Sequence, residues 1–133
     1  MKKSILAAAA LLLAGCAHTS TLTWTPAEPG QKSKAGHQVL WNLTATNTGM
    51  FLFYYIPLWS GYSTRPNRHD YELGQNQLTV PKTRRLLEDK LVELKADKVE
   101  DWEITETSSG AFSLWIIWKR SVRATGVAVK LRR

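Results

Sequence analysis

This sequence of 133 residues has one cysteine, three histidines and no long hydrophobic run. A single cysteine excludes an intrachain disulfide framework and a zinc site built from several cysteines. The histidines are far apart in the chain, and no HExxH motif, phosphate-cradling glycine loop or nucleophile elbow accompanies them. We therefore predict no metal, no cofactor and no catalytic residues, and expect the protein not to be an enzyme.

The most apolar stretch of the chain is Ile5–Ala14, which is about half of the roughly 20 residues that a membrane-spanning helix needs. It follows the cationic start Met1-Lys2-Lys3 and ends in small residues. A charged start, a short apolar core and a small-residue cut site are typical of a secretory signal. Residues 1–15 are therefore predicted to be a signal peptide.

Leu13-Ala14-Gly15-Cys16 closes this segment and resembles the lipobox of bacterial lipoproteins. The resemblance implies cleavage between Gly15 and Cys16, with diacylglycerol on the Cys16 thiol and a further acyl chain, such as palmitate, on its amine. Two or more acyl chains hold a protein stably on a bilayer. Ala17, rather than aspartate, follows Cys16, which by the same resemblance implies the outer membrane and a periplasm-facing domain.

Residues 16–38 are rich in threonine, serine, proline and glycine and hold few large apolar residues. Such a composition offers little burial to offset the entropy of ordering, so we predict a flexible tether. Trp24 is the exception. Two interpretations remain open for it: docking onto the domain, or a position at the lipid interface.

The first half of the predicted domain, which spans 39–133, holds two strand signals. Val39–Thr46 alternates partly and predicts a strand, and Asn47–Gly49 is typical of a turn. Met50–Trp59 is a continuous apolar and aromatic run that favours a buried strand, with its proline at an end or an edge. Ser60–Gln77 is rich in loop-forming residues and predicts a long loop.

The clearest helix is predicted at about 80–97. Thr79 is a suitable N-cap and Pro81 suits the first turn. The face predicted to be buried is a stripe at helical spacing, formed by Thr83, Leu87, Leu91 and Leu94.

Strand patterns dominate the rest of the chain. Lys98–Thr107 alternates, Ser108–Gly110 is a hairpin turn signal, and Ala111–Trp118 is apolar on both faces. Val122–Leu131 continues as a strand, with Gly126 at a bulge or a close backbone contact. We predict an α+β domain in which one main helix covers one face of an antiparallel sheet of about four to five strands.

A fainter resemblance covers the C-terminal half. The predicted helix, the step at Ala96-Asp97 and the motif Gly126-x-Ala128-Val129 are similar to the YbjQ-like domains and, more distantly, to the Rcs stress-sensor lipoprotein. The resemblance implies an α+β fold and leaves a homo-oligomer open. Lys95 and Lys98 depart from the family pattern, and heavy-metal binding is not carried over because no cysteine is free.

Charge is unevenly distributed. All six charged residues from Thr107 to the C-terminus are basic: Lys119, Arg120, Arg123, Lys130, Arg132 and Arg133. A basic patch attracts polyanions, and an envelope location favours lipopolysaccharide, anionic lipid or an acidic protein over nucleic acid. We take Lys119, Arg120 and Arg123 as candidate ligand contacts, the alternative being a solvated strand face.

The aromatic residues suggest a second kind of contact. Trp59, Tyr62 and Tyr71 flank or lie in the predicted long loop and are candidates to stack on a glycan such as peptidoglycan. The alternative is that most of the aromatic residues fill the core.

The function predicted from the sequence is a lipid-anchored, non-catalytic binding or scaffolding module of the cell envelope. A binder of envelope polyanions or glycans is the main alternative. A small hydrolase that uses the neighbouring His69 and Asp70 is a weaker one, because adjacent side chains seldom point at each other.

Overall fold

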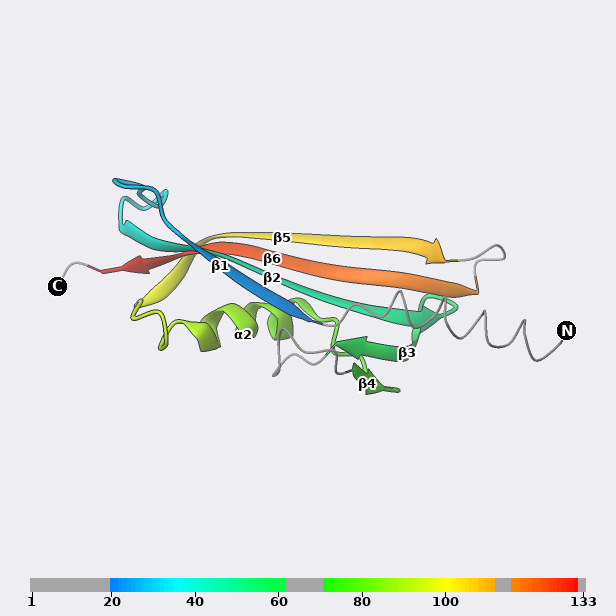
Figure 1. The fold of residues 1–133 in the computed structure, drawn as a ribbon. Coiled ribbons are helices and arrows are strands. Elements are labelled where there is room, and N and C mark those ends of the chain that lie inside the picture. Colours follow the sequence, from blue (N-terminus) through cyan, green and yellow to red (C-terminus); the bar gives the residue numbers. More distant parts are fainter. Residues whose placement is uncertain (1–19, 62–70, 112–115, 132–133) are drawn as a thin grey trace, which may run out of the picture.

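A computed structural model describes residues 20–61, 71–111 and 116–131 of the chain. They form an antiparallel sheet with one helix packed on one of its faces (Figure 1). This confirms the α+β prediction, although the sheet dominates and contains six strands rather than four to five.

Two long strands, β2 and β6, form the centre of the sheet. The six strands are β1 (Thr21–Pro26), β2 (Gln38–Leu52), β3 (Ile56–Gly61), β4 (Tyr71–Leu73), β5 (Lys98–Ala111) and β6 (Ile117–Lys130). Their order is β4-β3-β2-β6-β5, and β1 pairs with β2. Because β1 lies opposite residues 41–46 of β2 and β3 opposite residues 49–52, these two strands share one edge of β2.

The helix α2 (Val80–Lys90) begins as predicted. The Thr79 side chain accepts a hydrogen bond from the Lys82 backbone N–H, and proline occupies the first turn. The helix ends before the predicted residue 97. Lys95 adopts a left-handed backbone (φ 55°), and the Ala96 N–H donates to the Leu91 carbonyl, which closes the helix as a Schellman-type turn.

The helix covers small residues of the central strands. Leu86 and Leu87 pack into a buried cluster with Leu43, Ala45, Ala124 and Ala128, and Leu91 and Leu94 lie at its margin. The predicted stripe is therefore the buried face. Gly126 also belongs beneath the helix, because a Cβ there would lie 2.5 Å from the Val99 side chain. This confirms the close contact predicted at Gly126.

The prediction of a flexible tether is wrong for residues 20–38. Thr21–Pro26 is β1, Leu22 is buried in the main core, and Trp24 packs under the Lys90 ammonium at 4.0 Å. Docking is therefore the correct interpretation of Trp24. The composition did not predict this strand, because its threonines alternate on the exposed face and Leu22 is its one buried side chain.

Both predicted hairpin turns are wrong in position. Asn47–Gly49 lies inside β2, where the buried Asn47 amide donates to the Gln77 carbonyl and Gly49 leaves room for the Trp59 carbonyl. Ser108–Gly110 lies inside β5, paired with Lys119 and its neighbours in β6. Gly49 is therefore needed for close packing, and Ser108–Gly110 are accommodated in the exposed edge strand β5.

The apolar run Met50–Trp59 is not one strand. It contains the end of β2, a tight turn and the start of β3, with Phe53 and Tyr54 both at positive φ. Of the predicted strand Ala111–Trp118, the first residue ends β5 and residues 117–118 begin β6. The predicted strand Val122–Leu131 is the continuation of β6, which ends at Lys130. The predicted long loop, Ser60–Gln77, contains the end of β3 and the short strand β4.

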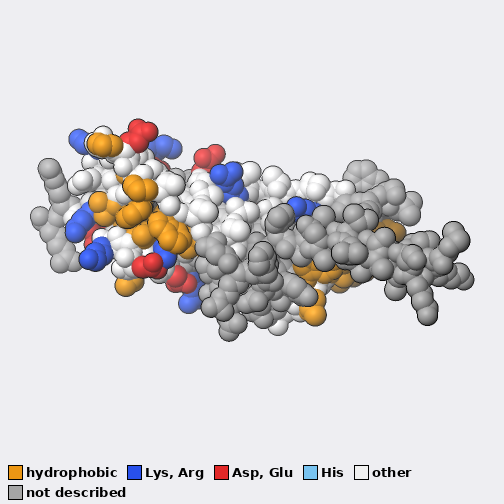
Figure 2. All heavy atoms as spheres, viewed as in Figure 1, with side chains coloured by type: hydrophobic (Ala, Val, Ile, Leu, Met, Phe, Trp, Pro, Cys, Tyr) orange, Lys and Arg blue, Asp and Glu red, His pale blue; other side chains and the backbone are white. Residues whose placement is uncertain are grey.

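The two ends of the sheet differ in character. Figure 2 shows charged side chains gathered at the left-hand end, which in Figure 1 holds the β1–β2 connection and the end of β6. The opposite end holds the β2–β3 turn and the start of β6.

Candidate functional site: a pocket around Arg120

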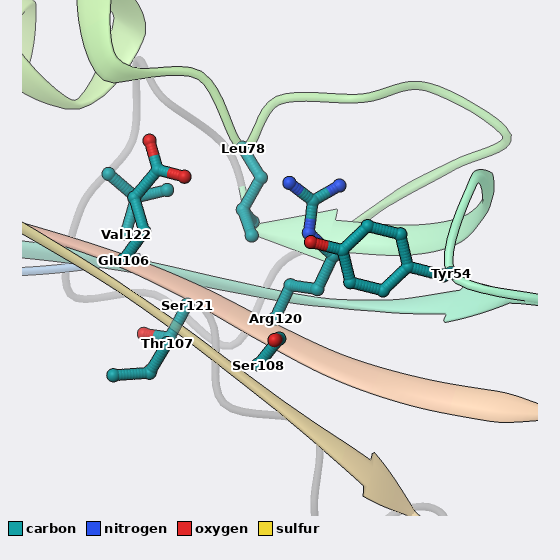
Figure 3. Close-up of a pocket in the computed structure, with 8 residues that line it drawn as sticks. All are labelled: Tyr54, Leu78, Glu106, Thr107, Ser108, Arg120, Ser121 and Val122. Carbon is teal, nitrogen blue, oxygen red and sulfur yellow. The ribbon is translucent and has the colours of Figure 1, made fainter. Parts of the chain in front are cut away.

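A pocket of about 260 Å³ opens on the helix-bearing face of the sheet, between α2 and the β2–β3 turn (Figure 3). It is lined by Tyr54, Leu78, Glu106, Thr107, Ser108, Arg120, Ser121 and Val122. Glu106 and Ser108 of β5 pair with Val122 and Arg120 of β6, and these four side chains share the helix-bearing face because residues alternate along a strand. Thr107 and Ser121 lie between them and belong to the opposite face.

Arg120 forms one wall of the pocket. Its guanidinium carbon lies 4.9 Å from the centre of the Phe51 ring and 4.8 Å from that of Tyr54. Tyr54 is held in turn by an edge-to-face contact with Trp118, with ring centres 5.3 Å apart. Within the described part of the chain no carboxylate forms an ion pair with Arg120. The cation is therefore positioned by aromatic rings, with its hydrogen-bond donors left for a ligand.

Glu106 lies on a different wall, beside Val122 (Figure 3). Leu78 and Val122 provide a buried apolar floor, and Ser108 adds a hydroxyl. A guanidinium binds phosphate or carboxylate in a bidentate manner. A carboxylate accepts hydrogen bonds from hydroxyl or ammonium groups. The pocket thus suits a ligand that carries an anionic group together with a hydroxyl or an amine.

The opposite face of the sheet is rich in hydroxyl groups, and we call it the hydroxyl face. Its rows follow the strand register: Thr23 opposite Thr44, Thr44 opposite Thr125, and Thr46 opposite Arg123. Its hydroxyl residues are Thr21, Thr23, Thr25, Thr44, Thr46, Thr48, Thr105, Thr107, Ser109, Ser121 and Thr125. A shallow groove of about 320 Å³ on it includes Thr48, Ser109, Ser121 and Lys119.

The basic residues singled out from the sequence do not share one surface. Lys119 and Arg123 belong to the hydroxyl face, whereas Arg120 lies in the pocket on the other face. Trp59 is half-buried and pairs with Met50 in the row that holds Lys119. The expectation of one basic patch is wrong, because these residues alternate along a single strand.

A serine, a histidine and a glutamate meet at the charged end of the sheet, outside the pocket. Ser33 Oγ donates to Glu100 at 2.5 Å, and His37 Nδ1 lies 2.8 Å from the same carboxylate. A catalytic triad needs the hydroxyl on the imidazole nitrogen that faces away from the carboxylate. Here hydroxyl and imidazole both bind the carboxylate, so the cluster fastens the β1–β2 connection to β5.

Glu100 is the most strongly held charge in this cluster. The Lys98 ammonium, 2.5 Å from its carboxylate, and the hydrogen bonds from Ser33 and His37 lower the pKa of Glu100 to about 2. Partial burial opposes this change but does not outweigh it. The carboxylate is therefore ionised at neutral pH, as a structural anchor requires.

Comparisons with protein-family models, curated proteins and solved structures give no match for this chain. Along the described ranges, no helix combines the length and apolarity needed to cross a membrane. The same ranges hold no group of three or more histidine, cysteine or acidic side chains arranged to bind a metal ion.

Several sequence-predicted site residues lie outside the described residues: Gly15, Cys16, Tyr62, His69 and Asp70. Tyr71 is described only as the first residue of β4. Two features escaped the sequence prediction: the aromatic support of Arg120 and the hydroxyl face. Threonine at every second position in 21–25 and 44–48 is the signal that would have revealed the latter.

Proposed function

We propose that this protein is a lipid-anchored, non-catalytic binding module of the bacterial cell envelope, with the Arg120 pocket as its binding site. The observation that carries the proposal is the Arg120 guanidinium held against the Phe51 and Tyr54 rings beside hydroxyl groups. A fixed cation with unused donors favours binding of an anion over chemistry on a substrate.

The ligand class follows from the two charged walls. Arg120 would take a phosphate or carboxylate, and Glu106 would accept a hydrogen bond from a neighbouring hydroxyl or amine. Phosphorylated or acidic sugars of the envelope, as in lipopolysaccharide and peptidoglycan, combine these groups. The apolar floor formed by Leu78 and Val122 would exclude water from the contact.

The matched pair Arg120→Gln and Arg123→Gln tests the pocket. Both variants remove one positive charge from β6, but Arg123 lies on the other face. We expect Arg120→Gln to weaken binding of purified lipopolysaccharide or soluble peptidoglycan fragments about tenfold or more, and Arg123→Gln less than about twofold. Calorimetric titration measures both. An equal loss in the two variants would mean that general surface charge binds the ligand, and would contradict the pocket.

The anchor is tested independently at Cys16. The lipobox resemblance leads us to expect acyl mass on the N-terminal fragment of the native protein and none on the Cys16→Ser variant. The variant should also leave the membrane fraction after an alkaline wash. An unmodified Cys16 in the native protein would refute the anchor without affecting the pocket.

Glycan binding on the hydroxyl face is a second candidate, because its flat rows of hydroxyls lie beside Trp59 and Lys119. Thr23→Val with Thr105→Val removes two exposed hydroxyls, neither of which lines the Arg120 pocket, and keeps strand-forming side chains. If this face binds glycan, retention on peptidoglycan sacculi should fall in this double variant and persist in Arg120→Gln. The reverse pattern would favour the pocket.

A further inference from the structure

Large apolar side chains are exposed together at the end of the sheet that holds the β2–β3 turn. Phe53, Tyr55, Ile56 and Ile116 are 57%, 80%, 53% and 39% exposed, and we call them the hairpin tip. The Phe53 N–H donates to the Ile116 carbonyl at 2.6 Å, so the β2–β3 turn and the start of β6 form one surface. Both lie at the right-hand end in Figure 1.

The turn that presents these residues is locally unfavourable. Phe53 and Tyr54 have φ of 49° and 73°, in the left-handed region that glycine and asparagine adopt most easily. Tyr54 has a packing reason to be there, since it contacts Arg120 and Trp118. Phe53 instead points large apolar surface at solvent, and Tyr55, whose ring meets Tyr54 edge-to-face, is 80% exposed. Residues that strain a turn without filling the core indicate a contact outside the protein.

The charges around the hairpin tip fit an anionic lipid surface. Neither 42–69 nor 107–133 contains an acidic residue. Lys119, on the hydroxyl face and away from the Arg120 pocket, follows Ile116 by three positions, or roughly 10 Å along an extended strand. The same order is found across a bilayer interface: apolar side chains of a surface-bound protein reach about 5–10 Å into the boundary between headgroups and acyl chains, and the charged headgroups lie above them. Tyrosines are common at that boundary.

The direction of β1 agrees with this orientation. Thr21 lies opposite Thr46, so the first residue of β1 is the one nearest to the hairpin tip. The five residue steps from Cys16 to Thr21 span at most about 17 Å. This point alone depends on lipidation of Cys16, which would put the acyl chains within reach of the tip-facing end of β1.

We infer that the hairpin tip is a membrane-contact surface that seats in the interface of a bilayer containing anionic lipid. The contact is additional to the lipid anchor and separate from ligand binding in the Arg120 pocket. It would hold the domain at a fixed orientation, with the hydroxyl face and the pocket opening sideways along the membrane.

The test uses the unlipidated mature chain, residues 16–133 with Cys16→Ser, and vesicles of phosphatidylcholine with and without phosphatidylglycerol. We expect it to sediment with the anionic vesicles and to bind the neutral ones more weakly. Replacing the tip with Phe53→Asn, Tyr55→Ser and Ile56→Thr should weaken vesicle binding at least tenfold. Asparagine suits the left-handed position and threonine suits a strand, so a urea midpoint no lower than that of the parent verifies the fold.

Val92→Ser is the matched control, because Val92 is 87% exposed and lies just beyond the C-terminal end of α2, outside the hairpin tip. It should bind vesicles like the parent chain. The inference is overturned if the parent binds neither vesicle, or if the tip variant binds as tightly as the control. It is also overturned if the tip variant only converts a dimer to a monomer in light scattering, which would identify a second copy as the partner. None of these results bears on Cys16 acylation or on the Arg120 pocket.

Discussion

At the scale of single residues, Glu100 does most to hold the charged end of the sheet. It receives the Ser33 hydroxyl, the His37 ring and the Lys98 ammonium, and so joins the β1–β2 connection to β5. Asp101 continues the link by accepting from the Lys34 N–H. Three donors on one carboxylate explain why the pKa of Glu100 falls to about 2.

This arrangement predicts a defined pH dependence. Because the pKa of Glu100 is lower in the folded state, its contribution to stability is complete above about pH 4.5 and is lost as the pH falls toward about 2. Glu100→Gln should lower the urea midpoint at pH 7, and the difference from the native protein should shrink across that window. Glu103→Gln, an exposed carboxylate on the same strand, is the control. A difference that stays constant down to pH 2 would show that the charge of Glu100 is unimportant.

At the scale of elements, β1 decides where the folded domain begins. Its Leu22 side chain is 4% exposed in the cluster beneath α2, while Thr23 points to the hydroxyl face. A tether would contribute nothing to stability, whereas a core strand contributes the burial of its apolar side chains.

We therefore expect Leu22→Ala to destabilise the fold by about 2–3 kcal/mol, the usual cost of emptying a buried leucine site. Thr23→Ala, its neighbour on the other face, should change stability by less than about 0.5 kcal/mol. Chemical denaturation of the two variants measures the contrast. Equal and negligible effects would mean that β1 is not part of the cooperative unit.

At the scale of the whole molecule, the sheet is long and is centred on its two longest strands, β2 and β6. Residues 42–46 of β2 have a paired strand on both sides, and β6 lies between β2 and β5. The three-residue strand β4 lies at the edge of the sheet and, among the described strands, pairs with β3 alone. Cooperative opening of such a sheet starts at its periphery.

Native-state hydrogen exchange should reveal this gradient. Amides of β2 and β6 near residues 42–46 and 123–127 should exchange only through global unfolding, and those of β4 at least about tenfold faster. Amide-resolved exchange by nuclear magnetic resonance measures both. Uniform protection across the sheet would contradict the proposed order of stability.

The parts of the fold that were predictable depend on local rules. The start of α2 follows from Thr79 and Pro81, and its buried face from leucine spacing, because capping and helical periodicity need no tertiary information. The hairpin turns were not predictable. Gly49 serves a close strand contact and Gly110 pairs with Trp118 inside the sheet, whereas the true turn carries Phe53 and Tyr54 at positive φ. Long-range packing decided both.

The candidate site, too, was predictable only in part. Arg120 stood out from the sequence as a charge in a basic region, but its ring partners come from residues about 70 positions earlier in β2 and the β2–β3 turn. Arg120 lies on the opposite face of the sheet from Lys119 and Arg123 because all three belong to one continuous strand with alternating side chains.

The sequence by itself determined the fold class and the one helix, because these depend on periodicity and capping within short segments. It also carries the lipobox-like Cys16 motif, which is a matter of order along the chain. The tertiary structure alone decided that residues 21–26 belong to the sheet, that Arg120 lies between aromatic rings, and that the exposed apolar residues gather at one end. Each of these depends on which distant strands pair and in what register. The energy of that pairing comes from contacts between segments far apart in the chain, so no local sequence pattern reports it.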